Sequence, residues 1–251
     1  MTKPRVYQTE AIIIKRTKLG EADRILTLYT PDYGKVRAVA KGSRRTNSKL
    51  GGHVELLTHS SLLLAKGRNL DIITQAQTIH SFLPLKEDLQ RMSCGLYITE
   101  LIDSFTAEDE GNRQIFELLR ETLDQLSLAQ KSDTIVRYFE MHLLEFTGYR
   151  PQLQQCANCG GALKPVQNYF SSSQGGALCG DCSYEEPIVL PLSLNALKVL
   201  RLWQNCDFDN AVKVTIRQEL AQELEQLLRE YIKYVLDRQL KSTAWLDIIK
   251  Q

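Results

Sequence analysis

Residues 9–49 read TEAIIIKRTKLGEADRILTLYTPDYGKVRAVAKGSRRTNSK. Three short apolar, β-branched runs are separated by turn residues, which is the pattern of a small β-sheet. Between Tyr33 and Val54 the chain has six Lys or Arg residues and no Asp or Glu. A cationic block of this density is typical of a surface that holds a phosphate backbone. The stretch therefore predicts a β-rich module with a nucleic-acid-binding edge.

Along residues 35–41, small apolar residues alternate with cations, so one face should pack in a core and the other should face solvent. The six cations of the block are the first-rank candidates for phosphate contacts: Lys35, Arg37, Lys41, Arg44, Arg45 and Lys49. A second rank contains cations whose strand face the sequence leaves open: Lys15, Arg16, Lys18 and Arg24. Tyr29 and Tyr33 flank the turn before this strand and either stack on bases or serve as a core residue and a turn residue.

The first eighty residues predict five short antiparallel strands without a helical crossover. Their expected ranges are residues 11–15, 24–30, 35–41, 54–66 and 70–79, with a bulge near residues 58–61 and a flexible basic loop over residues 42–52. The strand count and size fit an OB-fold barrel, and an SH3-like barrel fits as well. We expect residues 1–80 to form an OB-fold nucleic-acid-binding domain.

Helical periodicity begins after Phe82. The expected helices cover residues 85–105, 112–128, 133–147, 193–205 and 215–240. Asn112 and Ser193 are predicted N-caps, Ser132 or Asp133 is a third, and Thr215-x-x-Gln218 has the spacing of a capping box. We therefore predict an α+β multidomain protein in which residues 81–251 form a helical domain, interrupted by an insertion at about residues 152–190.

The formal net charge of +1 conceals two opposite halves. Residues 1–80 carry 14 Lys or Arg against 6 Asp or Glu, whereas residues 81–251 carry 17 against 24. A basic module joined to an acidic one suggests two different partners. No apolar run approaches the ~18 residues of a membrane span, and the N-terminus lacks signal-peptide features. These observations predict a cytoplasmic protein.

Two Cys-x-x-Cys pairs lie 19 residues apart in the insertion, at Cys156, Cys159, Cys179 and Cys182. This spacing is typical of a closed, structural site for one zinc ion. Gly160 and Gly180 follow one cysteine of each pair and allow the positive φ that such turns tend to need. Two disulfides, a redox pair and an iron–sulfur cluster are the alternatives, each less consistent with a cytoplasmic chain without a βαβ pattern. Cys94 and Cys206 are read as core residues.

Motifs of common enzyme classes are missing from the sequence. It contains no GxxxxGK[ST], GxGxxG, GxSxG or HExxH motif, and its four histidines have no ligand-like spacing. The chain is therefore predicted not to be an enzyme. A zinc-dependent hydrolase would need an open metal position, which four cysteines do not leave.

Several motifs together resemble the family of bacterial recombination mediators named RecO. In the first module they are Gly20-Glu21-Ala22-Asp23-Arg24, Tyr29-Thr30 with Gly34-Lys35, and Ala40-Lys41-Gly42-Ser43-Arg44-Arg45. Further on they are Thr147-Gly148-Tyr149-Arg150-Pro151 before the first cysteine pair, Gly175-Gly176 before the second, and Leu240-Lys241-Ser242. The resemblance covers nearly the whole chain.

This resemblance implies an N-terminal OB-fold and a helical domain with a zinc finger. It also implies binding of single- and double-stranded DNA, annealing of complementary strands, and partnership with RecR and single-stranded-DNA-binding protein (SSB) in loading RecA. The expected location is then the cytoplasm, in association with the nucleoid. A zinc-bearing protein-interaction adaptor whose basic block is only a solvated face is the alternative function.

Overall fold

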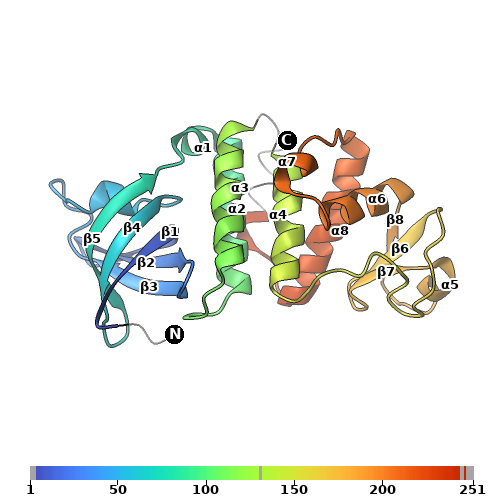
Figure 1. Ribbon diagram of the computed structural model, residues 1–251, viewed down its shortest axis with the longest axis horizontal. Helices are drawn as coiled ribbons and strands as arrows, with labels where there is room; N and C mark the ends of the chain where they lie inside the picture. Colours follow the sequence, from blue (N-terminus) through green and yellow to red (C-terminus); the bar gives the residue numbers. More distant parts are fainter. Residues whose placement is uncertain (1–3, 130–131, 244–245, 247–251) are drawn as a thin grey trace. The chain divides into compact units, whose positions relative to one another are not determined.

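The computed structural model describes residues 4–129, 132–243 and 246 (Figure 1). These residues form two compact units, one of residues 4–129 with 240–243 and 246, the other of residues 132–239. The boundary between the two units lies near residue 130, between two helices, and not at the end of the strands. The division into domains near residue 80 remains a prediction.

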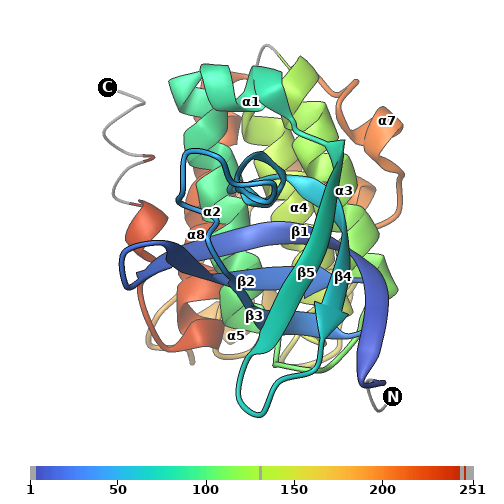
Figure 2. The ribbon, with the colours of Figure 1, turned by 90° about the vertical axis from the view of Figure 1, so that its left-hand side faces the viewer.

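The first unit begins with a closed five-stranded barrel in the order β1-β2-β3-β5-β4, as expected for an OB-fold (Figure 2). Its elements are β1 (Val6–Leu19), β2 (Asp23–Thr30), β3 (Gly34–Ala40), β4 (His59–Ala65) and β5 (Asp71–His80). A short 3₁₀ helix, η1 (Gly51–Val54), precedes β4. The expected strand from residue 54 is therefore wrong over its first residues, and the bulge lies between His59 and Ser60.

The barrel closes through a parallel pair. Ala38 lies opposite Asp71 and Val39 opposite Ile72, so β3 and β5 run in the same direction, whereas the other pairs are antiparallel. The prediction that all five strands are antiparallel is therefore wrong for this pair. Inside the barrel, the apolar residues of β3 join the core as predicted, together with Ile13, Leu26, Leu28, Leu62 and Leu64.

Three helices complete the first unit: α1 (Leu83–Glu87), α2 (Leu89–Phe105) and α3 (Arg113–Leu128). The expected single helix over residues 85–105 is interrupted because Asp88 has an extended backbone and its carboxylate accepts the Arg91 N–H. Asn112 caps α3 as predicted, at 3.2 Å from the Ile115 nitrogen. The backbone N–H groups of Lys241 and Ser242 donate to Glu100 of α2 at 2.9 and 2.8 Å. Residues 240–243 thus belong to the first unit.

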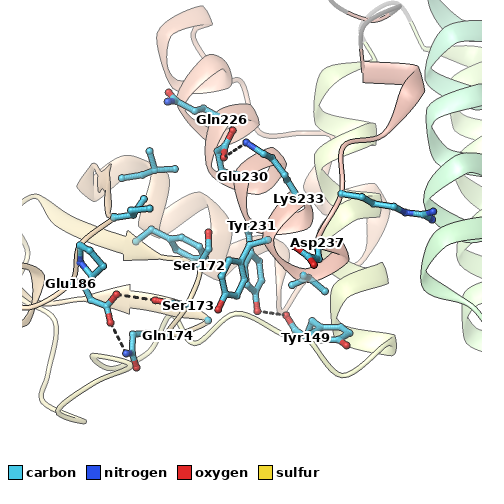
Figure 3. A pocket seen from close by; sticks show the side chains of 18 of the residues that line it. Tyr149, Ser172, Ser173, Gln174, Glu186, Gln226, Glu230, Tyr231, Lys233 and Asp237 are labelled. Atoms are coloured by element: carbon cyan, nitrogen blue, oxygen red, sulfur yellow. Dashed lines mark hydrogen bonds and ion pairs between the residues drawn. The ribbon is translucent and has the colours of Figure 1, made fainter.

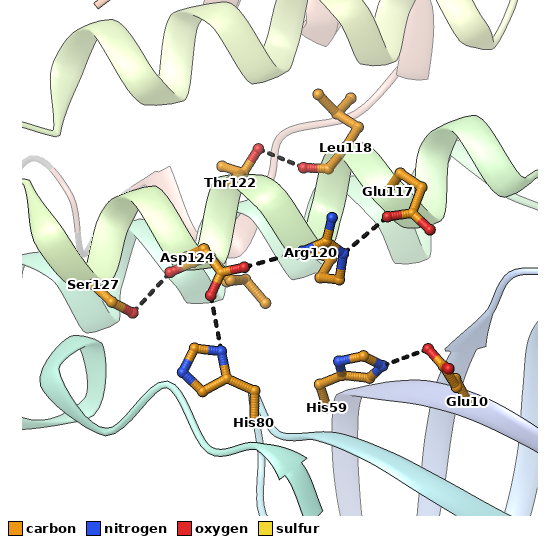
Figure 4. A network of polar contacts seen from close by, with 10 residues as sticks. Glu10, His59, His80, Glu117, Leu118, Arg120, Thr122, Asp124 and Ser127 are labelled. Carbon is orange, nitrogen blue, oxygen red and sulfur yellow. Dashed lines mark hydrogen bonds and ion pairs between the residues drawn. The ribbon is translucent and has the colours of Figure 1, made fainter. Parts of the chain in front are cut away.

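Helix α3 meets the barrel through two histidines on paired strands (Figure 4). His59 of β4 lies 3.0 Å from Glu10 of β1, and His80 of β5 lies 2.8 Å from Asp124 of α3. Burial lowers the pKa of His59, although its hydrogen bond to Glu10 acts in the opposite direction. The ring of His59 also packs edge-on against Phe116. Polar and aromatic contacts together fix α3 on this side of the barrel.

The second unit consists of a group of helices that pack on one another and a small three-stranded sheet beside them (Figure 1). The packed helices are α4 (Asp133–Phe146), α6 (Leu194–Trp203), α7 (Phe208–Ala211) and α8 (Gln218–Leu236), and the unit also contains the short α5 (Gly180–Ser183). The sheet has the order β7-β6-β8, formed by β6 (Asn168–Ser171), β7 (Gly176–Leu178) and β8 (Leu190–Leu192). Ser193 caps α6 as predicted. The predicted capping box at Thr215 is wrong, because α8 starts after Arg217 and no side chain caps it.

None of the helices in the described part of the chain combines the length and apolar character that a membrane crossing needs.

Candidate nucleic-acid interface and metal centre

Strand register decides which cations share a face of the barrel. Lys15 of β1, Thr27 of β2 and Arg37 of β3 lie opposite one another in successive pairs, so they belong to one outer row. Arg37 is exposed, whereas its neighbours Val36 and Ala38 are in the core. Core and solvent-facing residues therefore alternate along β3 as predicted, and the cations lie on its outer face.

Helix α2 engages one end of this outer face. The Asp103 carboxylate pairs with Lys15 at 3.1 Å and with Lys35 at 3.2 Å, and Lys35 also donates to the Asp103 carbonyl at 2.7 Å. Burial alone would raise the pKa of Asp103, but the two ammonium groups outweigh it and hold that pKa below its ordinary value. The side chain of Lys35 is only 12% exposed, and Tyr29 is fully buried. This placement argues against Lys35 as a free phosphate ligand and against base stacking on Tyr29.

We expect Asp103→Asn to destabilise the first unit by about 1–2 kcal/mol, because it leaves a nearly buried ammonium group without its carboxylate. It should strengthen DNA binding only slightly, because Lys15, 60% exposed, loses its carboxylate, whereas Lys35 is only 12% exposed; the salt slope should steepen by at most about 0.7. Urea denaturation and a salt series of DNA binding measure both effects. Asp32→Asn, which breaks an exposed pair with Arg113, is the control and should cost less than about 1 kcal/mol. A slope steeper by about 1.4 would contradict the expectation, because it would show that Lys35 is released to phosphate as well as Lys15.

Two of the second-rank candidates face the other side of the sheet. Arg16 lies opposite Leu26, one residue out of phase with the Lys15 row. Arg16 and Arg24 both pair with the carboxylate of Glu55, Arg24 at 2.9 Å. These two guanidinium groups therefore hold the segment after η1 against the barrel, and they are engaged before any ligand arrives.

The basic loop after β3 is ordered by the turn between β1 and β2. The Arg44 N–H donates to the Ala22 carbonyl at 2.9 Å, and its guanidinium donates to the Gly20 carbonyl at 3.0 Å. The Gly42 N–H donates to Asp23 at 2.7 Å. The expected flexible loop is thus a docked one. Four exposed cations belong to this loop, and a fifth lies near the end of β1. We call these five residues the basic rim: Lys18, Lys41, Arg44, Arg45 and Lys49.

Two cations outside the predicted set lie in the turn between β4 and β5. Lys66 and Arg68 are exposed there, and together with Arg37 they line a cleft of about 270 Å³. We call Arg37, Lys66 and Arg68 the turn cluster. The parallel pairing of β3 with β5 brings this turn beside β3. The Lys-Gly-Arg-Asn turn was visible in the sequence, but the strand that it adjoins was not.

In the second unit, four cysteines converge as their spacing predicted. The sulfur atoms of Cys156, Cys159, Cys179 and Cys182 all lie within 4.8 Å of one another. The Cys159 and Cys179 sulfurs are 3.9 Å apart, close to the ~3.8 Å edge of a tetrahedron of sulfurs ~2.3 Å from zinc. All four cysteines are unbridged. This geometry fits a metal ion with four thiolate ligands and not a pair of disulfides.

Backbone turns build the two halves of the cysteine cluster. After Cys159, Gly160 has a φ of +70° and its N–H donates to the Cys156 carbonyl at 2.9 Å. The second pair instead starts the helical turn α5, and Gly180 is not among the residues with positive φ, which corrects the prediction for that glycine. Backbone N–H groups near Cys156 outweigh the effect of burial and lower the pKa of its thiol to about 6. Side-chain hydrogen bonds with Cys179 and Cys159 instead raise the pKa of Cys182, so the support for a metal ion comes from the convergence of the four sulfur atoms.

The sheet next to the cysteines has a small core of its own. Cys156, Cys182 and Leu178 are buried together, with Leu163, Tyr169 and Val189 partly buried around them. We call residues 152–190 the ribbon. Because two of these three buried residues are cysteines, the fold of the ribbon should depend on the metal.

A groove of about 1010 Å³ separates the ribbon from α8 within the second unit (Figure 3). Buried Phe170 and Tyr231 contribute to its lining, and Tyr149, Ile188 and Tyr234 add exposed apolar surface. Glu186 accepts hydrogen bonds from Ser173 at 2.8 Å and Gln174 at 2.6 Å, which anchors one wall. Mixed apolar and polar lining of this size suits a binding surface.

The fold and the two sites define the class of protein: an OB-barrel protein with a cationic rim and a cluster of four cysteines that could bind a metal ion. Family models for the N-terminal and C-terminal parts of recombination protein O match residues 1–82 and 86–244. The chain belongs to the RecO family of DNA repair proteins.

Relatives at full length support the same assignment. The DNA repair protein RecO of Dehalococcoides mccartyi strain 195 is 43% identical over 251 residues, covering 100% of this chain and 99% of its own. That of Roseiflexus sp. is 43% identical over 249 residues, covering 99% and 88%. That of Syntrophus aciditrophicus is 31% identical over 256 residues, covering 100% and 99%. The resemblance read from the sequence is thereby confirmed.

Proposed function

We propose that this protein is a non-enzymatic recombination mediator. It binds single- and double-stranded DNA, anneals complementary strands and, with RecR, helps to load RecA onto single strands coated by SSB. The observation that carries the proposal is the basic rim, in which Lys18, Lys41, Arg45 and Lys49 have no ion-pair partner among the described residues. Cations that the protein does not neutralise itself are available to phosphates.

Annealing follows from charge neutralisation. Two single strands repel each other through their phosphates, and a cationic surface lowers that repulsion where both strands are held. Such contacts carry no sequence information, so binding should be indifferent to sequence. The protein then needs no catalytic group for this reaction.

The remaining parts of the proposal concern the metal, the partners and the location. One structural zinc ion held by the four cysteines maintains the ribbon. RecR and SSB are the protein partners, and the protein acts in the cytoplasm in association with the nucleoid. Family membership supports these statements, while the chain itself supplies the cysteine geometry.

Fluorescence anisotropy of a labelled single-stranded oligonucleotide across a salt series tests DNA binding. If the five rim cations each hold one phosphate, log K should fall with log salt at a slope of about −3.5. Arg44→Glu/Arg45→Glu should weaken binding about tenfold and reduce the slope by about 1.4. Lys164→Glu/Lys198→Glu, the same charge change on exposed residues of the second unit, is the control. A wild-type slope near zero, or no binding at low salt, would refute the proposal.

A second candidate function is a protein-interaction adaptor, and the groove beside α8 is the observation that favours it. An adaptor would bind a partner protein and show no DNA affinity at moderate salt. The same anisotropy series therefore separates the two functions.

A further inference from the structure

We propose that Cys159 and Cys179 are an oxidation site, where hydrogen peroxide joins the two sulfur atoms in a disulfide and the metal ion is released. This inference rests on the proposed zinc ion and deepens it, because the four cysteines then divide into a reactive pair and a pair that stays reduced. Oxidation loosens the ribbon around the cysteines, and a dithiol with zinc restores it.

The four sulfur atoms differ in their access to solvent. Cys159 is exposed and Cys179 is partly exposed. Cys156 and Cys182 belong instead to the buried core of the ribbon, at 1% and 8% exposure. A cysteine that binds a metal is a thiolate, and the oxidation of a thiolate depends on its exposure. A small oxidant in the solvent therefore reaches Cys159 first.

The two more accessible sulfur atoms are also close enough to join. They come from different Cys-x-x-Cys pairs, and 3.9 Å separates the sulfur of Cys159 from that of Cys179. A disulfide has a sulfur–sulfur distance of about 2.05 Å, so the two atoms need to approach by about 1.9 Å. The backbone has room for this movement, because a Cβ atom built at Gly160 or Gly180, the residues after the two cysteines, would meet nothing within 4 Å.

The buried pair is held in place by the ribbon itself. The sulfur of Cys156 accepts the Cys179 N–H at 3.4 Å, and the Cys156 N–H donates to the Gly161 carbonyl at 2.8 Å. Cys182 packs with Cys156 and Leu178. Once the accessible pair is a disulfide, two thiolates are left, and two ligands do not complete the tetrahedral coordination of a structural zinc ion. The ion is therefore released.

The reaction balances in atoms and electrons. The Cys159 thiolate attacks one oxygen of hydrogen peroxide, the O–O bond breaks, and the products are a sulfenic acid at Cys159 and a hydroxide ion. The Cys179 thiolate then attacks the Cys159 sulfur, the S–S bond forms, and a second hydroxide ion leaves. Two protons from solvent convert the hydroxide ions to water, and two electrons have passed from the sulfur atoms to the peroxide. A dithiol reverses the step by thiol–disulfide exchange.

Metal release weakens the core of the ribbon but not its attachment to α8. That attachment needs no metal: the Phe170 ring packs edge-on against Tyr231 of α8 at 5.4 Å between ring centres, and the Tyr231 hydroxyl donates to the Tyr149 carbonyl at 3.0 Å. The core, in contrast, has Leu178 as its third buried residue beside two cysteines. Limited proteolysis of the oxidised protein should therefore show new cleavage inside residues 152–190.

Titration of the intact, zinc-loaded protein with hydrogen peroxide tests the inference. A chromogenic chelator measures zinc release, and mass spectrometry of alkylated, digested samples identifies the disulfide-linked peptides. We expect about one zinc ion released per peroxide consumed, with a Cys159–Cys179 disulfide as the first product and recovery on adding dithiothreitol and zinc. A first disulfide within one Cys-x-x-Cys pair would overturn the inference, and so would zinc that stays bound after Cys159 and Cys179 are joined.

Two histidine variants isolate the reactive pair, since a site of three cysteines and one histidine still binds zinc. Cys179→His removes the partner of Cys159 and should slow peroxide-driven zinc release about tenfold. Cys182→His is the matched control, because it keeps both reactive sulfur atoms, and it should release zinc at the wild-type rate. Equal rates in the two variants contradict the inference. If either variant holds no zinc before treatment, the peptide map of the wild type decides alone.

Cys206 is an internal reference, because it is partly exposed and lies outside the cluster. Oxidation of Cys206 before Cys159 would count against a reactive pair. Metal analysis of the untreated protein separates the inference from the proposed zinc ion. A wild type that carries zinc and keeps it in peroxide refutes the oxidation site alone, whereas a wild type without zinc refutes both.

Discussion

Replacing Cys159 with serine is expected to release the metal and unfold the ribbon while the barrel stays folded. Cys159 is the exposed member of the cluster, so exchanging its sulfur for oxygen disturbs little packing. It removes one of four thiolate ligands from a site whose binding free energy in zinc-finger peptides is about 10–16 kcal/mol. A loss of several kcal/mol exceeds what the small core around Leu178 can replace.

Zinc content per chain and limited proteolysis measure this outcome. Wild type should carry one ion, and Cys159→Ser much less, with new cleavage inside residues 152–190. Cys206→Ser is the matched control, because this cysteine is partly exposed and lies outside the cluster. Treating wild type with a chelator should reproduce the variant. Full metal content in Cys159→Ser, or an equal loss in Cys206→Ser, would contradict four-thiolate ligation.

Local patterns predicted those parts of the fold that local physics controls. The alternation of apolar and charged residues on β3 decided its core face, because side chains of a strand alternate whatever the strand pairs with. Asn112 and Ser193 cap helices because each side chain bonds a backbone N–H only three residues away. The four cysteines were likewise predictable, since each pair is a short turn.

Contacts between distant residues explain what the sequence did not reveal. Lys35 looked like its neighbours on β3, yet its partner Asp103 lies 68 residues further on. The turn of Lys66 and Arg68 became a candidate only through the parallel closure of the barrel. Thr215 shows the reverse case: the local sequence matches a capping box, but the first helical residue of α8 is Gln218, two residues later than a cap at Thr215 requires.

Gly34→Ala is expected to destabilise the first unit by about 2–5 kcal/mol. Gly34 has a φ of +59°, and a Cβ atom built there would lie 1.9 Å from the backbone oxygen of Glu110. Left-handed backbone costs an alanine roughly 1–2 kcal/mol. The overlap adds about 1–3 kcal/mol of displacement, because the neighbour is backbone and cannot rotate away.

Gly20→Ala isolates the conformational part of this cost. Gly20 has nearly the same φ, +58°, and a Cβ atom there would meet nothing within 4 Å. It should therefore lose only about 1–2 kcal/mol in urea denaturation. The additional loss in free energy of unfolding of Gly34→Ala over Gly20→Ala measures how firmly the acidic loop of residues 106–111 packs on the turn between β2 and β3. Equal losses in both variants would contradict the expectation, because they would show that this loop moves away from residue 34 without a measurable cost.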